Sequence, residues 1–156
     1  MSLDVAIVGA GIGGLTAALA LSEAGHGVTL VERRTGFSEV GAGLQLSPNA
    51  SRILIGLGLG APLRRAACEP PGVTVRALRT GRTIGSVRLG EPVRERYGAP
   101  YYVIHRADLQ TLLLDAVRSR ATIRLLMGRD VVGLAETREG AVLTVETVAA
   151  GRSETL

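Results

Sequence analysis

A glycine cluster between two strand-like segments restricts the fold of this chain more than any other feature. The pattern G-x-G-x-x-G occupies residues 9–14, directly after the apolar, β-branched residues 3–8 and at the start of a helix-like segment, residues 12–24. A second apolar segment, residues 28–32, follows at once. Two strands joined by one helix over so short a distance have to be parallel, with a right-handed crossover. The sequence therefore predicts the first unit of a parallel α/β sheet.

Each glycine of this pattern has a distinct use in a dinucleotide site. Gly9 permits the tight turn, Gly11 lets a pyrophosphate approach the backbone, and Gly14 lets the helix pack closely on the strand. The N–H groups and the dipole of the helix N-terminus would face the anion. Glu32 ends the second strand, where a carboxylate can accept hydrogen bonds from both hydroxyls of an adenosine ribose. The pattern thus favours a dinucleotide site over a turn that serves packing alone.

The charges around Glu32 bear on which dinucleotide binds. A carboxylate at this position disfavours a 2′-phosphate on the ribose, because two anions repel each other. Arg33 and Arg34 follow it directly and would favour such a phosphate. Since both arginines lie beyond the acid, we expect them to line the adenosine side or to face solvent.

The rest of the chain alternates strand-like and helical segments. Two apolar segments joined by RTGR form a predicted hairpin, which cannot be central in a parallel sheet and is expected to begin a second sheet. We expect a loop over residues 37–47, then a helix that starts at Pro48, has Ser47 as its N-cap and frays near residues 60–62. The other expected elements are the hairpin strands 73–78 and 83–89, a strand at 101–104, a helix over 107–120, a strand at 122–127, and an antiparallel pair at 131–135 and 142–148.

Composition argues against several other classes of protein. All 18 basic residues are arginines, and only 3% of residues are aromatic. Because the arginines are scattered and stacking aromatics are scarce, nucleic-acid binding is not expected. Cys68 is the single cysteine, so the chain has no internal disulfide and no cysteine-based metal site. The chain has no basic signal-peptide segment, and its longest apolar stretch, residues 10–21, is too short for a membrane span, so we expect a cytoplasmic protein that does not bind membranes.

Two further motifs lie outside the first glycine pattern. In GAGLQLSPNA, glycines allow another close backbone approach, and Gln45 offers both a donor and an acceptor. This segment suits a cofactor that extends toward a flat heteroaromatic ring, and equally an ordinary glycine loop before the next helix. In HRADLQTLL, Arg106 precedes a helix whose first turn contains Asp108. An arginine beside helix N–H groups favours a phosphate or ribityl oxygen, whereas Asp108 alone would only complement the helix dipole.

The motifs VAIVGAGIGGLTAALAL…VTLVERR, GAGLQLSPNA and HRADLQTLL occur in this order. Together they resemble the FAD-dependent aromatic hydroxylases, the single-component flavoprotein monooxygenases of the para-hydroxybenzoate and salicylate hydroxylase type, over residues 5–148. The resemblance implies an α/β fold: a Rossmann-like FAD-binding domain with a parallel sheet, plus β-hairpin insertions that begin a substrate-domain sheet. Residues 1–72 and 101–156 would form the FAD-binding domain, and residues 73–100 would start the substrate domain. The later ADG and GD motifs of the family are absent, so we expect the N-terminal part of a protein about twice as long.

The resemblance also implies cofactor contacts for residues of all three motifs and for one later position. They are Gly9, Gly11, Ile12, Gly13 and Gly14 for the pyrophosphate, Glu32 and Arg33 for the adenosine, Gln45 for the flavin end, Arg106 and Gln110 for the FAD chain, and the backbone of Val131 for the adenine. No residue stands out as a catalytic acid or base, and no cluster stands out as a metal site. This pattern fits a family in which the flavin is the reactive group.

The family reaction implied is hydroxylation of a small aromatic substrate, in which NADH or NADPH reduces FAD and O₂ supplies the new hydroxyl oxygen. No histidine or cysteine is placed as an obvious flavin tether, so FAD is expected to bind without a covalent link. The substrate and the choice between NADH and NADPH stay open. So do two other functions: another FAD oxidoreductase of the same fold, such as a halogenase or a geranylgeranyl reductase, and a non-catalytic dinucleotide-binding module. By itself the chain is expected to be inactive, because it supplies few walls to shield a flavin from water.

Overall fold

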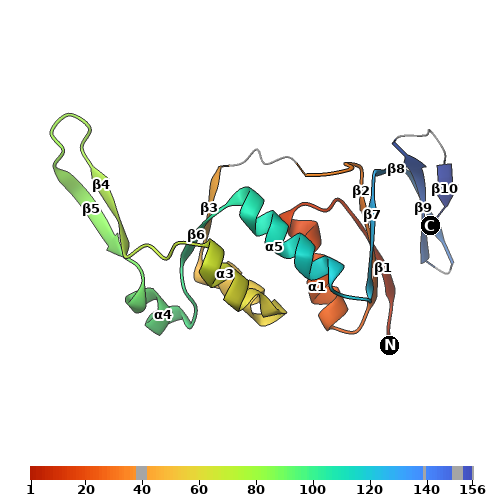
Figure 1. The fold of residues 1–156 in the computed structure, drawn as a ribbon, viewed down its shortest axis with the longest axis horizontal. Helices are drawn as coiled ribbons and strands as arrows, with labels where there is room; N and C mark the ends of the chain where they lie inside the picture. The colour runs from red at the N-terminus through yellow and green to blue at the C-terminus, as the bar shows by residue number, and fades with distance from the viewer. Residues whose placement is uncertain (38–41, 139, 149–152, 156) are drawn as a thin grey trace. The chain divides into compact units, whose positions relative to one another are not determined.

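The computed structural model describes residues 1–37, 42–138, 140–148 and 153–155, and Figure 1 shows its helices and strands. The chain divides into two compact units, one from Met1–Glu39 and Leu113–Leu156 and the other from Val40–Leu112. The first unit is discontinuous in sequence and contains the predicted parallel sheet. The second unit is one continuous segment.

A parallel sheet of three strands forms the centre of the first unit. Its order is β1-β2-β7, so β2 is the central strand. The elements are β1 (Asp4–Val8), α1 (Ile12–Glu23), β2 (Gly27–Glu32) and β7 (Ile123–Met127). In the register, Val5 lies opposite Val28, and Leu30 lies opposite Leu125. The predicted strand–helix–strand unit with parallel strands is confirmed.

Aliphatic side chains form the core between α1 and this sheet. Leu15 and Leu19 of α1 are fully buried, and so is Leu30 of the central strand. Burying side chains of this size is the main stabilising contribution in a chain with so few aromatic residues.

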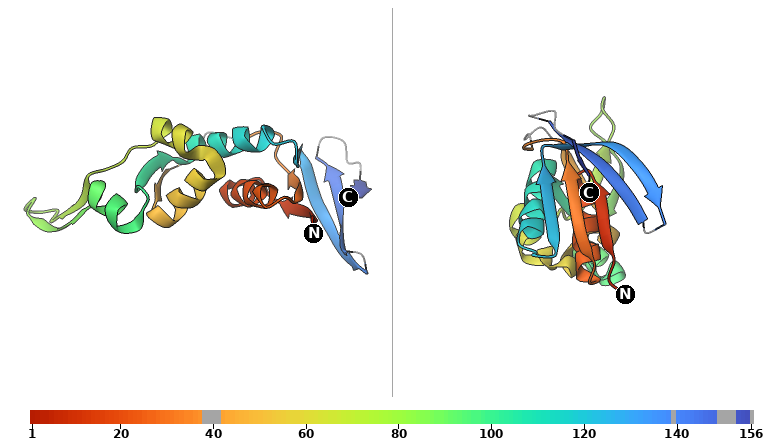
Figure 2. Two further views of the ribbon diagram at one scale, coloured as in Figure 1. Left: turned by 90° about the horizontal axis from the view of Figure 1, so that it is seen from below. Right: turned by 90° about the vertical axis from the view of Figure 1, so that its right-hand side faces the viewer.

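An antiparallel sheet follows β7 in the same unit. Its order is β10-β9-β8, and its strands are β8 (Arg129–Thr137), β9 (Gly140–Thr147) and β10 (Ser153–Thr155). Gly128, with a φ of 67°, forms the corner between β7 and β8. A bulge between Val131 and Gly133 interrupts the β8–β9 register. The predicted antiparallel pair is confirmed, and Figure 2 shows this sheet and α1 on opposite faces of the parallel sheet.

The second unit combines two antiparallel strand pairs with helices. β3 (Gly43–Leu46) pairs with β6 (Tyr102–His105), and β4 (Gly72–Arg76) pairs with β5 (Thr83–Arg88). The helices are α2 (Pro48–Leu54), the π-helical turn η1 (Ile55–Leu59), α3 (Gly60–Ala66), α4 (Glu91–Tyr97) and α5 (Arg106–Arg118), which extends beyond the unit. The predicted β4–β5 hairpin is confirmed, and every residue of its two strands is exposed.

Two expectations for the segment before the hairpin are wrong. Residues 37–47 are not loop throughout, because β3 lies there and β6 supplies its hydrogen-bonding partner from far along the chain. The helix that begins at Pro48 does not fray near residues 60–62. Gly58 adopts a φ of 89°, which kinks the helix without ending it, and helical structure resumes as far as Ala66.

Two further details of this unit differ from the sequence-based picture. Ser47 occupies the N-cap position, but its hydroxyl hydrogen-bonds Asn49 and does not cap the helix. The short helix α4 was not predicted; it lies between Gly90 and Gly98 and buries Val93.

In the described part of the chain, no helix has the length and apolarity needed to cross a membrane.

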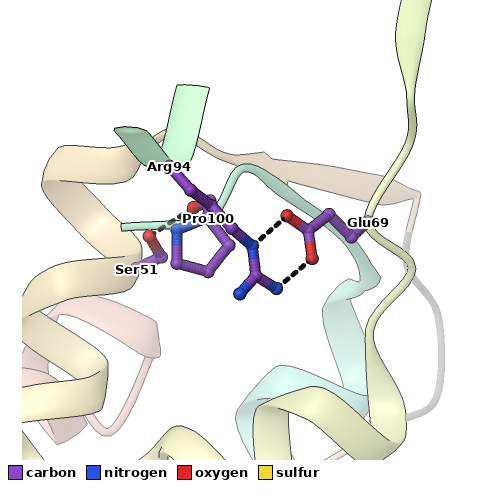
Figure 3. Close-up of polar contacts among 4 residues, drawn as sticks. All are labelled: Ser51, Glu69, Arg94 and Pro100. Atoms are coloured by element: carbon purple, nitrogen blue, oxygen red, sulfur yellow. Dashed lines mark hydrogen bonds and ion pairs between the residues drawn. The ribbon is translucent and has the colours of Figure 1, made fainter. Parts of the chain in front are cut away.

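Two polar contacts fix α2 and α4 of the second unit to neighbouring segments (Figure 3). The buried Ser51 hydroxyl of α2 donates a hydrogen bond of 2.6 Å to the carbonyl oxygen of Pro100. The Arg94 guanidinium of α4 donates two hydrogen bonds to the Glu69 carboxylate, and the one from Nε to Oε1 is 2.6 Å long. Glu69 precedes the β4–β5 hairpin in the sequence and Pro100 follows it, so these contacts fix both ends of the segment that contains the hairpin.

Replacing Glu69 by glutamine should lower the free energy of unfolding by less than about 1 kcal/mol at neutral pH, because the pair with Arg94 is partly exposed. The hydrogen bond from Arg94 lowers the pKa of Glu69 below its ordinary value of 4.5. The stabilisation is therefore complete above that ordinary value and is lost as the pH falls through the lowered pKa. Urea denaturation of both proteins from pH 7 to pH 3 checks this, with Glu95→Gln on the exposed side of α4 as the control. A difference that grows with acidity would contradict it.

Candidate dinucleotide site

The glycine turn closes tightly between the first two strands. Gly9 has a φ of 97°, a conformation that favours glycine, and its N–H donates a hydrogen bond of 2.7 Å to the carbonyl oxygen of Val31. This contact joins the end of β1 to the end of β2. The turn therefore lies at the carboxyl edge of the parallel sheet, the edge at which open α/β sheets bind ligands.

The remaining glycines of the turn fall into two kinds. A Cβ added to Gly14 would lie 1.9 Å from the carbonyl oxygen of Gly9, so only glycine lets α1 approach β1 this closely. Gly11 and Gly13 are exposed, and a Cβ on either would meet no atom within 4 Å. One glycine thus serves packing, and two leave the outer side of the turn open for another molecule.

The N-terminus of α1 has the features of an anion-binding helix end. Gly11 is the N-cap and supplies no side-chain cap, and the first turn of this helix carries no acidic residue. The first N–H groups of a helix have no partner within the helix, so they require an acceptor from elsewhere. A pyrophosphate at the open side of the glycine turn would provide it.

Glu32 is almost completely buried at the end of β2, with 9% of its surface exposed. Its Oε2 accepts a hydrogen bond of 2.8 Å from the Ala10 N–H, and its Oε1 accepts one of 2.9 Å from the Arg34 N–H. The carboxylate thus contacts the glycine turn and also the segment that leaves β2. Each carboxylate oxygen has a further acceptor site, so ribose hydroxyls could be added to these contacts.

A cavity of about 270 Å³ brings Gly9 and Glu32 together with the start of β8. Its lining includes four residues expected from the sequence and four others: Val8, Gly9, Val31, Glu32, Arg33, Arg129, Asp130 and Val131. Val131, expected beside an adenine, therefore does share a cavity with Glu32. Arg129 and Asp130 were missed by the sequence analysis, although they directly precede Val131 in GRDVV.

The other candidate residues belong to the second unit. Gln45 is exposed on β3, and its Oε1 accepts a hydrogen bond of 2.6 Å from the Tyr101 hydroxyl. Arg106 is the exposed first residue of α5, and its N–H donates to the carbonyl oxygen of Ala42 over 3.3 Å. Gln110 lies one turn further along α5 and is partly buried. Tyr101 was not singled out from the sequence, and Gly41 of the second motif lies outside the described residues.

Comparison with known proteins identifies the protein family in which these features occur. Residues 2–156 match the family model described as FAD binding domain. The chain belongs to this FAD-binding family. The open glycine turn, the uncapped helix N-terminus and the buried acid fit the pyrophosphate and ribose of FAD. Among the described residues, no group of acidic, histidine or cysteine side chains could hold a metal ion.

Individual relatives show which enzymes of this family the chain is similar to. The chain is 46% identical over 111 residues to a 3-amino-4-hydroxybenzoate 2-monooxygenase, PtmB3, from Streptomyces platensis, covering 71% of this chain and 28% of that protein. It is 36% identical over 140 residues to a 3-hydroxybenzoate 6-hydroxylase from Polaromonas naphthalenivorans strain CJ2, covering 90% of this chain and 35% of that protein. The resemblance to FAD-dependent aromatic hydroxylases is confirmed.

A solved structure supports the fold. Klebsiella pneumoniae HpxO, in complex with FAD and uric acid, superposes with a TM-score of 0.80 at 26% identity, over 99% of this chain and 37% of HpxO. The predicted α/β FAD-binding fold is confirmed. The chain spans about a third of the length of these proteins. They are therefore longer, relative to this chain, than the factor of two expected from the sequence.

Proposed function

We propose that this chain is the FAD-binding part of a monooxygenase that hydroxylates a small aromatic or heteroaromatic acid, with NADH or NADPH as reductant and O₂ as the oxygen source. FAD supplies the redox chemistry when it is bound. The observation that carries the proposal is the match of the whole chain to the FAD-binding family, together with relatives named for hydroxybenzoate chemistry. In the chain itself, the glycine turn and Glu32 support it.

The first unit would bind the adenosine and pyrophosphate half of FAD. The pyrophosphate would lie on the glycine turn, over Ile12 and Gly13 at the start of α1, where helix N–H groups favour an anion. The Glu32 carboxylate would accept the ribose hydroxyls in the cavity that it lines. Arg33 and the backbone of Val131 line the same cavity, which supports their proposed places beside the adenosine and the adenine.

The second unit would bind the flavin half. Arg106 at the N-terminus of α5 and Gln110 one turn later would contact the chain between the pyrophosphate and the flavin. Gln45 would lie near the flavin ring. The Tyr101 hydroxyl takes one acceptor site of Gln45 Oε1, so the amide NH₂ and the second acceptor site of that oxygen could face a ligand.

Residues 73–100 would begin the substrate domain, with residues 1–72 and 101–156 as the FAD-binding domain. The β4–β5 hairpin supports this assignment. Val73, Val75 and Val87 expose 45%, 54% and 62% of their surface on a pair of strands that has no third partner among the described residues. An isolated hairpin of two strands is marginally stable, so further strands would complete it.

The proposal is tested on the protein that carries this chain. We expect it to be yellow after purification and to release free FAD on denaturation, because no covalent tether is foreseen. With a panel of hydroxybenzoates, one compound should accelerate NADH or NADPH oxidation and yield a hydroxylated product. A released cofactor other than FAD would contradict the binding proposal. Halogenated or reduced products, with no hydroxylation, would assign the chain to another class of FAD enzyme.

Replacing Arg106 by alanine should weaken FAD binding by about 1.5–3 kcal/mol, the range for a hydrogen bond to a charged group. Arg106→Lys should recover part of this, since lysine keeps the charge but not the planar fork. Fluorescence titration of the apoprotein with FAD measures both. Arg118→Ala, at the exposed C-terminal end of the same helix, is the control. Wild-type affinity in both Arg106 variants would make this residue an ordinary surface charge.

A further inference from the structure

We propose that the Glu32 carboxylate has a second task, which is to hold the two walls of the adenosine cavity at a fixed separation before any cofactor binds. One wall is the glycine turn, and the other is the start of β8. This positioning role follows from contacts within the first unit. Only its effect on cofactor affinity rests on the proposed function.

The two carboxylate oxygens of Glu32 face different segments of the backbone. Oε2 receives the N–H of Ala10, which is completely buried, and Oε1 receives the N–H of Arg34. Both contacts are short, and both involve an ionised acceptor in a nearly buried position, where such hydrogen bonds are strong. The carboxylate is therefore a bridge between the turn after β1 and the segment after β2.

The bridge continues through the backbone to the corner before β8. The carbonyl oxygen of Arg34 accepts a hydrogen bond of 3.0 Å from the N–H of Gly128, at the corner between β7 and β8. The carbonyl oxygen of Gly128 accepts another, also 3.0 Å long, from Val148 after β9. Arg129 follows Gly128 directly and lines the cavity. One series of hydrogen bonds thus joins the glycine turn, through Glu32, to the corner from which β8 starts.

An amide side chain cannot replace the carboxylate in this bridge. A carboxylate presents two acceptor oxygens, whereas the glutamine amide presents one acceptor and one NH₂ donor. With glutamine at position 32, one of the two backbone N–H groups would face another donor. The bridge therefore needs an acid for a reason independent of the ribose.

The test is hydrogen–deuterium exchange of the FAD-free protein that carries this chain, read residue by residue by fragmentation mass spectrometry. In the wild type, the amides of Ala10 and Arg34 should be protected without FAD. In Glu32→Gln, at least one of them should exchange about tenfold faster, as expected for the loss of one such hydrogen bond. Glu136→Gln removes an exposed carboxylate from β8 and should leave both amides at their wild-type rates.

FAD affinity, measured on the same variants, separates this role from the ribose contact. Faster exchange with unchanged affinity would keep the bridge and refute the ribose contact. Unchanged exchange with weaker affinity would overturn the bridge and keep the ribose contact. If Glu32→Gln does not fold, the wild-type measurement decides, because unprotected amides at both Ala10 and Arg34 in the FAD-free protein would also overturn the bridge.

Discussion

Replacing Gly14 by alanine is expected to prevent FAD binding and to destabilise the first unit by roughly 3 kcal/mol or more, at the upper end of the cost of overpacking. The new Cβ would lie 1.9 Å from the carbonyl oxygen of Gly9. That oxygen belongs to the backbone, so no side chain can rotate to make room. The start of α1 would have to move away from β1, and the turn that presents N–H groups to the pyrophosphate would be lost.

Gly13 provides a matched control one position away. A Cβ there meets no atom within 4 Å, and Gly13 is exposed within the same helix. Gly13→Ala should therefore keep or slightly raise the stability of the FAD-free protein, since alanine favours a helix by up to about 1 kcal/mol. Thermal unfolding of the apoprotein and its FAD content after reconstitution measure both variants. Equal stability of the two would contradict the close approach of α1 to β1.

Leu30→Ala is expected to destabilise the first unit by about 2–5 kcal/mol, the range for truncating a fully buried leucine. Leu30 is completely buried on β2, the central strand of the parallel sheet, and lies two residues before Glu32. Its truncation leaves a cavity beneath the strand that positions this acid. FAD should consequently be retained less well on gel filtration.

The control for Leu30 is the same substitution at an exposed site. Leu134 on the edge strand β8 exposes 67% of its surface, so Leu134→Ala should change stability by less than about 0.5 kcal/mol. Denaturant titration compares the two variants. A smaller loss for Leu30 than for Leu134 would mean that β2 is not the central strand of the core.

The parallel unit could be predicted because its signals are local. The apolar residues of β1 and β2 and the glycines between them lie within the first 32 residues. Together they are compatible with one geometry, a parallel strand–helix–strand unit. β3 was missed because residues 43–46 show no strand signal of their own. The strand depends on pairing with β6, which lies far along the chain. The continuation of the helix past Gly58 depends on a positive φ, which glycine permits but does not require.

In the candidate site, too, some features could be predicted from the sequence and others could not. Glu32 and the glycines were identified because their spacing follows from the geometry of a short crossover. The hydrogen bonds of Glu32 to Ala10 and Arg34 were not predictable, because they depend on the register of β1 against β2 and on the turn after β2. The Tyr101–Gln45 contact joins residues 56 positions apart, and no sequence spacing indicates it.

The division of the chain has a consequence for its folding during synthesis. The second unit, Val40–Leu112, is continuous, so all of its residues leave the ribosome before β7 at residues 123–127 does. The parallel sheet needs β7 as the third strand, and pairing β7 with β2 closes a loop that contains the whole second unit. We expect the second unit, which is completed earlier, to fold first, while β1, α1 and β2 stay partly exposed until residue 127 has emerged.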